Sequence, residues 1–183
     1  MRRYIIFFSI ITITVVGVLA VRAGYYPIAL VGSEVLLARE FWSEYRAATT
    51  YYEKSRGVYG ATSTLPVAEM ERVVLDAMIE EALIRGAVRR EAGADASHLI
   101  SARVDSFLGD TELLQAADAA YGVDAAAFRA LVLVPQAERE ILTGQLFLRG
   151  EKLQDWLKQA KRDEQIRVFT PGFRWSGEEV EVE

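Results

Sequence analysis

Apolar residues recur at helical spacing along most of this chain, and the clearest run begins at Val74. Its apolar positions repeat every three or four residues and are Leu75, Met78, Ile79, Ala82, Leu83 and Gly86. This spacing places them on one face of a helix. Acidic residues dominate the first half and arginines the second, as the helix dipole favours. Gly93 is the residue type that most often ends a helix, so the pattern predicts an amphipathic helix that stops there.

The segment before this helix predicts a small hairpin followed by another helix. Residues 28–31 and 34–36 are short enough and apolar enough for two strands, and Gly32-Ser33 between them indicates a turn. A helix is predicted from about Leu37 to Ser55. A loop containing two glycines and Pro66 should connect it to the amphipathic helix.

Further helices are predicted after Gly93. Their expected N-caps are side chains that can accept a hydrogen bond from a helical N–H group, namely Ser97, Asp110 or Thr111, and Asp124. Pro135 predicts a kink or a restart, because proline lacks the N–H donor and restricts the residue before it. One helix should then run to about Glu164, and residues 166–169 alternate like a strand. The predicted fold class is mainly α, with one short strand region at each end.

The N-terminal residues predict a membrane segment. No charge interrupts residues 4–21, and Arg2 and Arg3 precede them. A helix of this length covers roughly 27 Å, close to the hydrocarbon thickness of a bilayer. The two arginines favour a cytoplasmic N-terminus, which places the rest of the chain outside. A cleaved signal peptide is the alternative, since Ala20 and Ala23 occupy positions that suit a signal peptidase.

These patterns divide the chain into five parts. They are a cytoplasmic stub (1–3), a transmembrane anchor (4–22), a connector (23–27), a helical domain (28–175) and an acidic tail (176–183). The expected localisation is the cytoplasmic membrane, with a single span and an extracytoplasmic C-terminal domain.

Composition excludes several classes of chemistry. The chain has no cysteine and a single histidine, His98, so disulfides, thiolate catalysis and multi-histidine metal sites have no residues to be built from. The net charge of -5 does not favour binding to nucleic acid. The sequence therefore predicts no catalytic residue, no cofactor, no metal site and no nucleic-acid partner.

The order of these elements resembles the N-terminal chaperone domain of the SurA/PrsA/PpiD group of exported parvulin-type foldases. The resemblance rests on the stretches "VGSEVLLAREF" (31–41), "VLDAMIEEALIRGAVRREAGADASHLISARV" (74–104) and "AAYGVDAAAFRALV", which ends at Val132. Gly32, Ser33 and Leu37 differ from the family pattern. The resemblance covers roughly residues 29–175, and no parvulin domain fits in the remainder.

The resemblance implies an ATP-independent chaperone-like protein that binds unfolded or nascent exported polypeptides. It also implies a relative of peptidyl-prolyl isomerases that lacks their activity. A non-catalytic envelope adaptor that docks one partner is the alternative.

Aromatic side chains crowd the first helix and the loop behind it, and they are the candidate client-binding residues. Exposed apolar surface suits this task because its contacts are not sequence-specific. The candidates are Phe41, Trp42, Tyr45, Tyr52 and Tyr59. The alternative is that these rings pack in the core against the face from Leu75 to Leu83.

Overall fold

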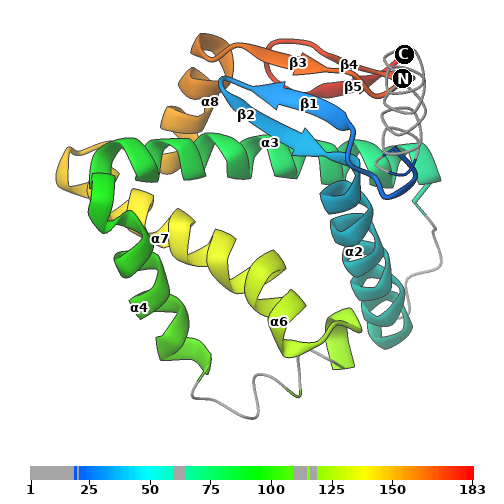
Figure 1. The fold of residues 1–183 in the computed structure, drawn as a ribbon, viewed down its shortest axis with the longest axis horizontal. Coiled ribbons are helices and arrows are strands. Elements are labelled where there is room, and N and C mark those ends of the chain that lie inside the picture. Colours follow the sequence, from blue (N-terminus) through cyan, green and yellow to red (C-terminus); the bar gives the residue numbers. More distant parts are fainter. Residues whose placement is uncertain (1–18, 20, 60–64, 109–114, 116–118) are drawn as a thin grey trace, which may run out of the picture.

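The computed structural model describes residues 19, 21–59, 65–108, 115 and 119–183, and this part of the chain is mainly helical with a few short strands (Figure 1). Its helices are α2 (Ala38–Tyr59), α3 (Val67–Ala92), α4 (Ala96–Leu108), α6 (Ala125–Phe128), α7 (Val134–Leu148) and α8 (Leu153–Asp163), with a 3-10 turn η1 (Gly93–Asp95) and a π-helical turn η2 (Arg129–Leu133). Its strands are β1 (Pro27–Val31), β2 (Glu34–Leu37), β3 (Ile166–Val168), β4 (Phe173–Trp175) and β5 (Val180–Val182).

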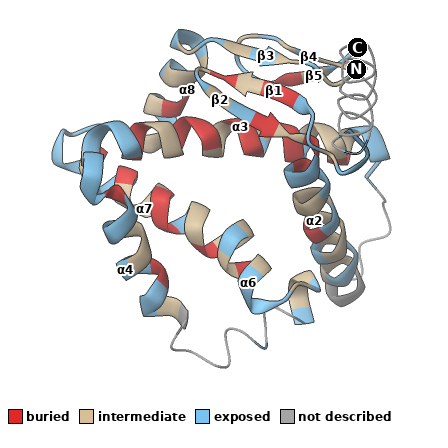
Figure 2. Cartoon of the chain, viewed as in Figure 1, coloured by how far each residue is buried: buried red, intermediate tan, exposed pale blue. Residues whose placement is uncertain are grey.

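Helix α3 forms the centre of the fold. In Figure 1 the strands and α8 lie on one side of it, and α2, α4, α6 and α7 lie on the other. Figure 2 shows buried positions along much of its length. Leu75, Ile79 and Leu83 are almost fully buried, which confirms the face predicted from their spacing. The helix ends at Gly93, whose φ of 54° confirms the predicted stop.

The predicted hairpin is present, and β3 extends it into a three-stranded antiparallel sheet of order β2-β1-β3. Gly32 is the first residue of the two-residue turn and has a φ of +58°. Positive φ at this position alone is typical of a type II′ turn, which requires glycine there. A Cβ at residue 32 would also lie 2.7 Å from Glu164 Oε1. Gly32 therefore serves both the turn and the close approach of the chain after α8.

Several predicted element boundaries are wrong. Ser97 lies inside the first turn of α4 rather than at its N-cap, because η1 leads directly into the helix. Helix α2 continues through Gly57 to Tyr59. Asp124 is an N-cap as predicted, and its Oδ1 accepts a hydrogen bond from Ala127 N at 2.7 Å. The cap predicted at Asp110 or Thr111 falls outside the described residues.

The long helix predicted between Gln136 and Glu164 is two helices, α7 and α8. The break is a Schellman motif at Gly150, whose φ is +74°. Gly150 N donates to Phe147 O at 3.0 Å, and Glu151 N donates to Leu146 O at 2.9 Å. These two bonds satisfy carbonyl groups that the end of α7 would otherwise leave unpaired. The turn sends α8 back across α3.

The segment predicted as an acidic tail, residues 176–183, contributes a strand that packs against α3. Strand β5 pairs with β4 in a hairpin, and Val180 is fully buried. Val180 N donates to Asp76 Oδ1 at 3.2 Å, and Arg72 donates to Val180 O at 3.3 Å. The tail glutamates form ion pairs with Arg162, Arg72 and Arg174. The domain therefore extends to the C-terminus.

We predict that Val180→Ala lowers the free energy of unfolding by about 2 kcal/mol, because it removes buried methyl groups from a closed core. Urea titration of the full chain, followed by tryptophan fluorescence, measures this change. Val182→Ala is the matched control, since Val182 lies in the same strand and is exposed. It should change the free energy by less than about 0.5 kcal/mol. Equal effects of the two substitutions would contradict the docking of the tail on α3.

Candidate functional site

A cleft lies between α2, α3 and η2, and it is the candidate functional site. It consists of two cavities of about 520 and 220 Å³ that share Glu44 and Leu131 in their walls and therefore adjoin. The larger cavity is polar, and its charged lining includes Glu34, Glu40, Glu44, Glu81, Arg39, Arg46 and Arg85. The smaller cavity is apolar apart from Glu44 and the Tyr121 hydroxyl, and its other lining residues are Ala47, Ala48, Val73, Val74, Ala77, Leu131 and Val132. We call these two parts the acidic half and the apolar half of the cleft.

On α2 and on α3, the residues that line the cleft are spaced so that they lie on one face of each helix. On α2, Glu40, Glu44 and Ala47 are spaced at i, i+4 and i+7, which places them on one face. On α3, Val73 and Ala77 are followed at the same interval by Glu81. The polar residues come first along α2 and last along α3. The two polar stretches coincide, so one end of the cleft is polar and the other apolar.

The third wall is the π-helical turn η2. Val134 N donates to Arg129 O, five residues earlier, which is the bond that defines a π turn. Pro135 follows, and a proline ring in an α-helix would clash with the carbonyl four residues earlier, at Leu131. The wider turn relieves this clash, so the restart predicted at Pro135 is a π turn without a break in the helix. Leu131 and Val132 then line the apolar half. Leu133 points away from it and packs in a core cluster with Val104 and Phe128.

One aromatic ring, that of Tyr121, lines the apolar half, and a second ring packs behind it. Tyr51 on α2 stacks on Tyr121 with ring centroids 4.9 Å apart, and Tyr121 lines the cavity. Lys54 also donates a hydrogen bond to Ala119 O at 2.6 Å, which ties α2 to the chain before Gly122. Val73 at the rim is 43% exposed and Tyr51 is 47% exposed. The apolar half is therefore open to solvent at its edge.

Arg85 lines the acidic half and pairs with two carboxylates. It forms a salt bridge with Glu34 of β2, and its Nε lies 3.4 Å from Glu138 Oε2 on α7. Glu138 is only 3% exposed. Burial raises the pKa of the Glu138 carboxyl, and the charge of Arg85 opposes that rise. Arg85 therefore links β2, α3 and α7 through two carboxylates, one of which has almost no access to water.

Glu44 and Glu81 are the two carboxyl groups of the cleft with strongly raised pKa values. Burial raises the pKa of Glu44 from 4.5 to about 8, and the charge of Glu81 adds to this rise. Burial likewise raises the pKa of Glu81 to about 7, although Arg85 and Arg139 oppose the shift. Within the described residues neither carboxylate has a cation within 4.0 Å. Both groups therefore titrate near neutral pH, so that at pH 7 Glu44 is mostly protonated and Glu81 is about half protonated.

These protons make stability depend on pH. Between pH 4.5 and about 8 the folded chain holds a proton on Glu44 that the unfolded chain releases. The free energy of unfolding contributed by this group is therefore highest at low pH and falls as pH rises through that window. We predict that Glu44→Gln flattens the fall between pH 5.5 and 8.5 in urea titrations. Glu53→Gln, on the exposed side of the same helix, should leave it unchanged. An unchanged slope in Glu44→Gln would contradict the burial of this carboxyl.

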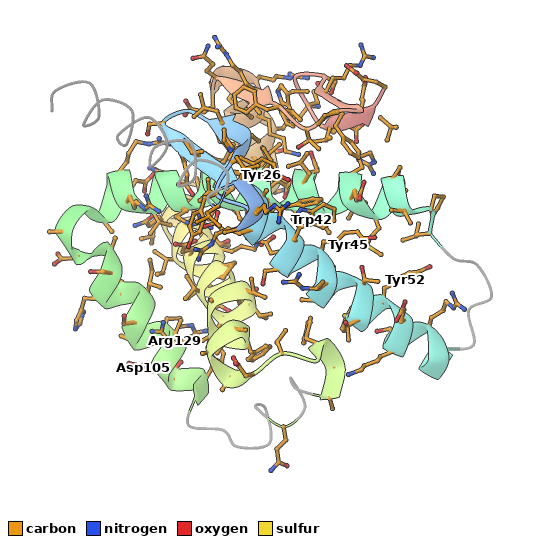
Figure 3. The ribbon with its side chains drawn as sticks, turned by 45° about the vertical axis from the view of Figure 1, so that its right-hand side comes forward. Tyr26, Trp42, Tyr45, Tyr52, Asp105 and Arg129 are labelled. Carbon is orange, nitrogen blue, oxygen red and sulfur yellow. The ribbon has the colours of Figure 1, made fainter. Side chains whose placement is uncertain are left out.

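The five candidate aromatics do not gather in the cleft. Phe41 is 5% exposed and belongs to the main core, and Tyr45 and Tyr52 are half-buried against that core. Trp42 is 41% exposed and packs edge-on against Phe41 and Tyr45. The side chain of Tyr59 lies outside the described residues. In Figure 3 Trp42, Tyr45 and Tyr52 follow one another along α2.

The spacing of these residues explains the difference. Tyr45 and Tyr52 follow Phe41 at i+4 and i+11 and share its core-facing side of α2. The cleft is lined from another side of this helix, the one that carries Glu40 and Glu44. Sequence reasoning missed Tyr121 and the apolar residues of α3 and η2. Only the tertiary arrangement brings these residues together. The one local signal is Tyr51, which follows Glu44 at i+7 and therefore lies on the same face of α2.

Other features named from the sequence have fewer structural consequences. His98 is exposed in the first turns of α4. Within the described ranges no group of three or more potential ligand side chains could hold a metal ion. No helix in the same ranges has the length and apolar character needed to cross a membrane. The predicted span at residues 4–22 lies outside those ranges, except for residues 19, 21 and 22.

Comparison with known proteins yields no relative: no family model, no curated protein and no solved structure matches the chain.

Proposed function

We propose that this protein is an ATP-independent chaperone-like protein, anchored in the cytoplasmic membrane, that holds apolar segments of unfolded exported polypeptides in the cleft between α2, α3 and η2. The observation that carries the proposal is the apolar half of the cleft. It is an open cavity of about 220 Å³ lined mainly by aliphatic side chains and by Tyr121, on which Tyr51 stacks. Such a surface binds side chains by removing apolar area from water, without demanding a particular sequence.

Two further observations support this function. The sequence stretches that resemble the SurA/PrsA/PpiD chaperone domain include both the β1–β2 hairpin and the central helix α3. Helix α3 packs against α2 and against α7, and η2 continues directly into α7, so tertiary contacts hold the walls of the cleft. A preformed site loses less conformational entropy on binding than one that must fold around its ligand.

The proposal is tested by suppression of aggregation. The full chain, reconstituted in phosphatidylcholine nanodiscs, is mixed with a chemically denatured client, and light scattering is followed after dilution. A several-fold excess of the protein should reduce scattering without ATP, whereas empty nanodiscs should not. Unchanged scattering at that excess would contradict the function.

An adaptor that docks one partner is the second candidate, and one surface favours it. Phe147 and Leu148, at the end of α7, are 79% and 85% exposed. Adjacent apolar side chains with this exposure are typical of contact sites. Replacing both by serine separates the two functions. A chaperone that uses the cleft should still suppress aggregation in this variant. An adaptor should instead capture one partner in a pull-down with the unchanged chain and lose it in the variant.

A further inference from the structure

We infer that the cleft selects segments in which a lysine or arginine lies next to a run of apolar side chains. This inference rests on the proposed function, because it specifies which clients the cleft takes. It starts from the continuity of the two halves, which share Glu44 and Leu131. A segment whose apolar side chains fill the smaller cavity must place its next residues at Glu44, and beyond it the polar cavity opens.

The acidic half has carboxyl groups that the protein's own cations do not contact. Arg85 is already engaged by Glu34 and Glu138, on two different elements. Arg139 forms its salt bridge with Glu80, at 3.8 Å, and acts on Glu81 only from a longer distance.

The two other arginines that line this cavity, Arg39 and Arg46, form no salt bridge with Glu44 or Glu81 either. Arg39 lies over the ring of Tyr25, 4.8 Å from its centroid, and donates to its hydroxyl. Arg46 is exposed. Among the described residues Glu44 and Glu81 are thus left without a salt bridge, on facing walls of the cleft.

A cationic side chain from a client fits this arrangement on physical grounds. An ammonium or guanidinium group between Glu44 and Glu81 would form charge-assisted hydrogen bonds, which are stronger than neutral ones. It would also offset the repulsion between the two carboxylates, which raises the pKa of Glu44. A segment with an acidic residue at the same position would meet like charges in a partly desolvated site. The site therefore discriminates by attraction and by repulsion together.

The stem of the cationic side chain adds to the fit. Lysine and arginine carry three or four methylene groups before the charge, and these can lie along apolar surface while the head group reaches a polar one. Leu131 lies where the two cavities meet and offers such a surface. A short cation directly on the backbone could not span this transition.

The experiment compares two fluorescein-labelled peptides that differ at one position. Both have the same run of five apolar residues, followed by lysine in one and glutamine in the other. Binding to the full chain in phosphatidylcholine nanodiscs is measured by fluorescence anisotropy at a pH of about 8, with empty nanodiscs as the blank. The zwitterionic lipid keeps the basic peptide from binding to the bilayer by charge.

We expect the lysine peptide to bind at least tenfold more tightly, and this preference to disappear in Glu44→Gln/Glu81→Gln. The amides have the size of the carboxyl groups that they replace, and burial already disfavours the charge of those groups, so the fold should remain. Glu53→Gln is the matched control and should keep the preference. The same tenfold preference in the double variant would overturn the assignment of the cation to Glu44 and Glu81.

The remaining outcomes separate this inference from the function on which it rests. Equal, measurable binding of the two peptides would overturn the preference for a cation and leave the apolar clients intact. Absence of binding by either peptide would overturn the function as well. Absence of peptide binding with a concentration-dependent dimer that Ala77→Arg dissociates would identify a second copy of the chain as the occupant.

Discussion

Replacing Arg85 by methionine is expected to lower the free energy of unfolding at neutral pH by about 3 kcal/mol, because it leaves a buried carboxyl group without its partner. Glu138 is 3% exposed, and Arg85 is the cation 3.4 Å from its Oε2. The same substitution removes the salt bridge from Glu34, so that the contact between the β1–β2 hairpin and α3 weakens. Urea titration of the full chain measures the loss.

Two control variants identify the origin of this loss. Arg149→Met removes a more exposed salt bridge, to Glu91, and should change the free energy by less than about 1 kcal/mol. Arg85→Met/Glu138→Leu removes the buried carboxyl together with its partner and should recover much of the loss. A double variant as unstable as Arg85→Met would show that Arg85 stabilises the fold through Glu34 instead.

Replacing Ala77 by arginine is expected to reduce the affinity for an apolar peptide at least tenfold, which is the largest effect that a single change in the cleft should have. Ala77 is exposed on the wall of the apolar half. A long side chain there fills the cavity of about 220 Å³ and brings a guanidinium group to Glu81, one turn along α3. The substitution therefore competes with a client for both halves of the cleft.

Ala68→Arg is the matched control for this prediction. Residue 68 is an exposed alanine of the same helix, outside the walls of the cleft, and the change adds the same charge. Its affinity for the peptide should equal that of the unchanged chain, and the free energy of unfolding of both variants should change by less than about 0.5 kcal/mol. Equal loss of binding in the two variants would place the client elsewhere, or make net charge the cause.

Local patterns predict the parts of this fold that local interactions determine. The β1–β2 hairpin follows from Gly32, the buried face of α3 follows from the interval between Leu75 and Leu83, and the start of α6 follows from Asp124. In each case the residues that fix the element are a few positions apart. Propensity and periodicity are therefore sufficient to place them.

The errors arise where distant residues decide the outcome. The break at Gly150 resembles a tolerated helical glycine in sequence, and the Schellman bonds from Gly150 and Glu151 are visible only in the fold. The C-terminal segment has the charge of a solvated tail, yet Val180 is buried because Asp76 and Arg72 on α3 bind its backbone. A single sequence contains no local signal for these contacts.

The aromatic candidates and the cleft lie on different sides of α2. Aromatic content led to Phe41 and Tyr45, which pack in the core, whereas the walls of the cleft are formed mainly by small and aliphatic residues such as Ala77 and Leu131. Small residues leave the space that makes a cavity, and this cannot be recognised until three helices are placed around it. The raised pKa of Glu44 has the same origin, because burial causes most of it.

The central claim is that apolar client segments lie between α2, α3 and η2, and photo-cross-linking tests it most directly. An apolar peptide ending in lysine and carrying a benzophenone side chain is irradiated with the full chain in nanodiscs, and the modified residues are identified by mass spectrometry. The account predicts cross-links at Val73, Ala77 and Leu131 in the walls of the cleft, and their loss in Ala77→Arg. Cross-links confined to Trp42 and Tyr45, or to Phe147 and Leu148, would contradict it.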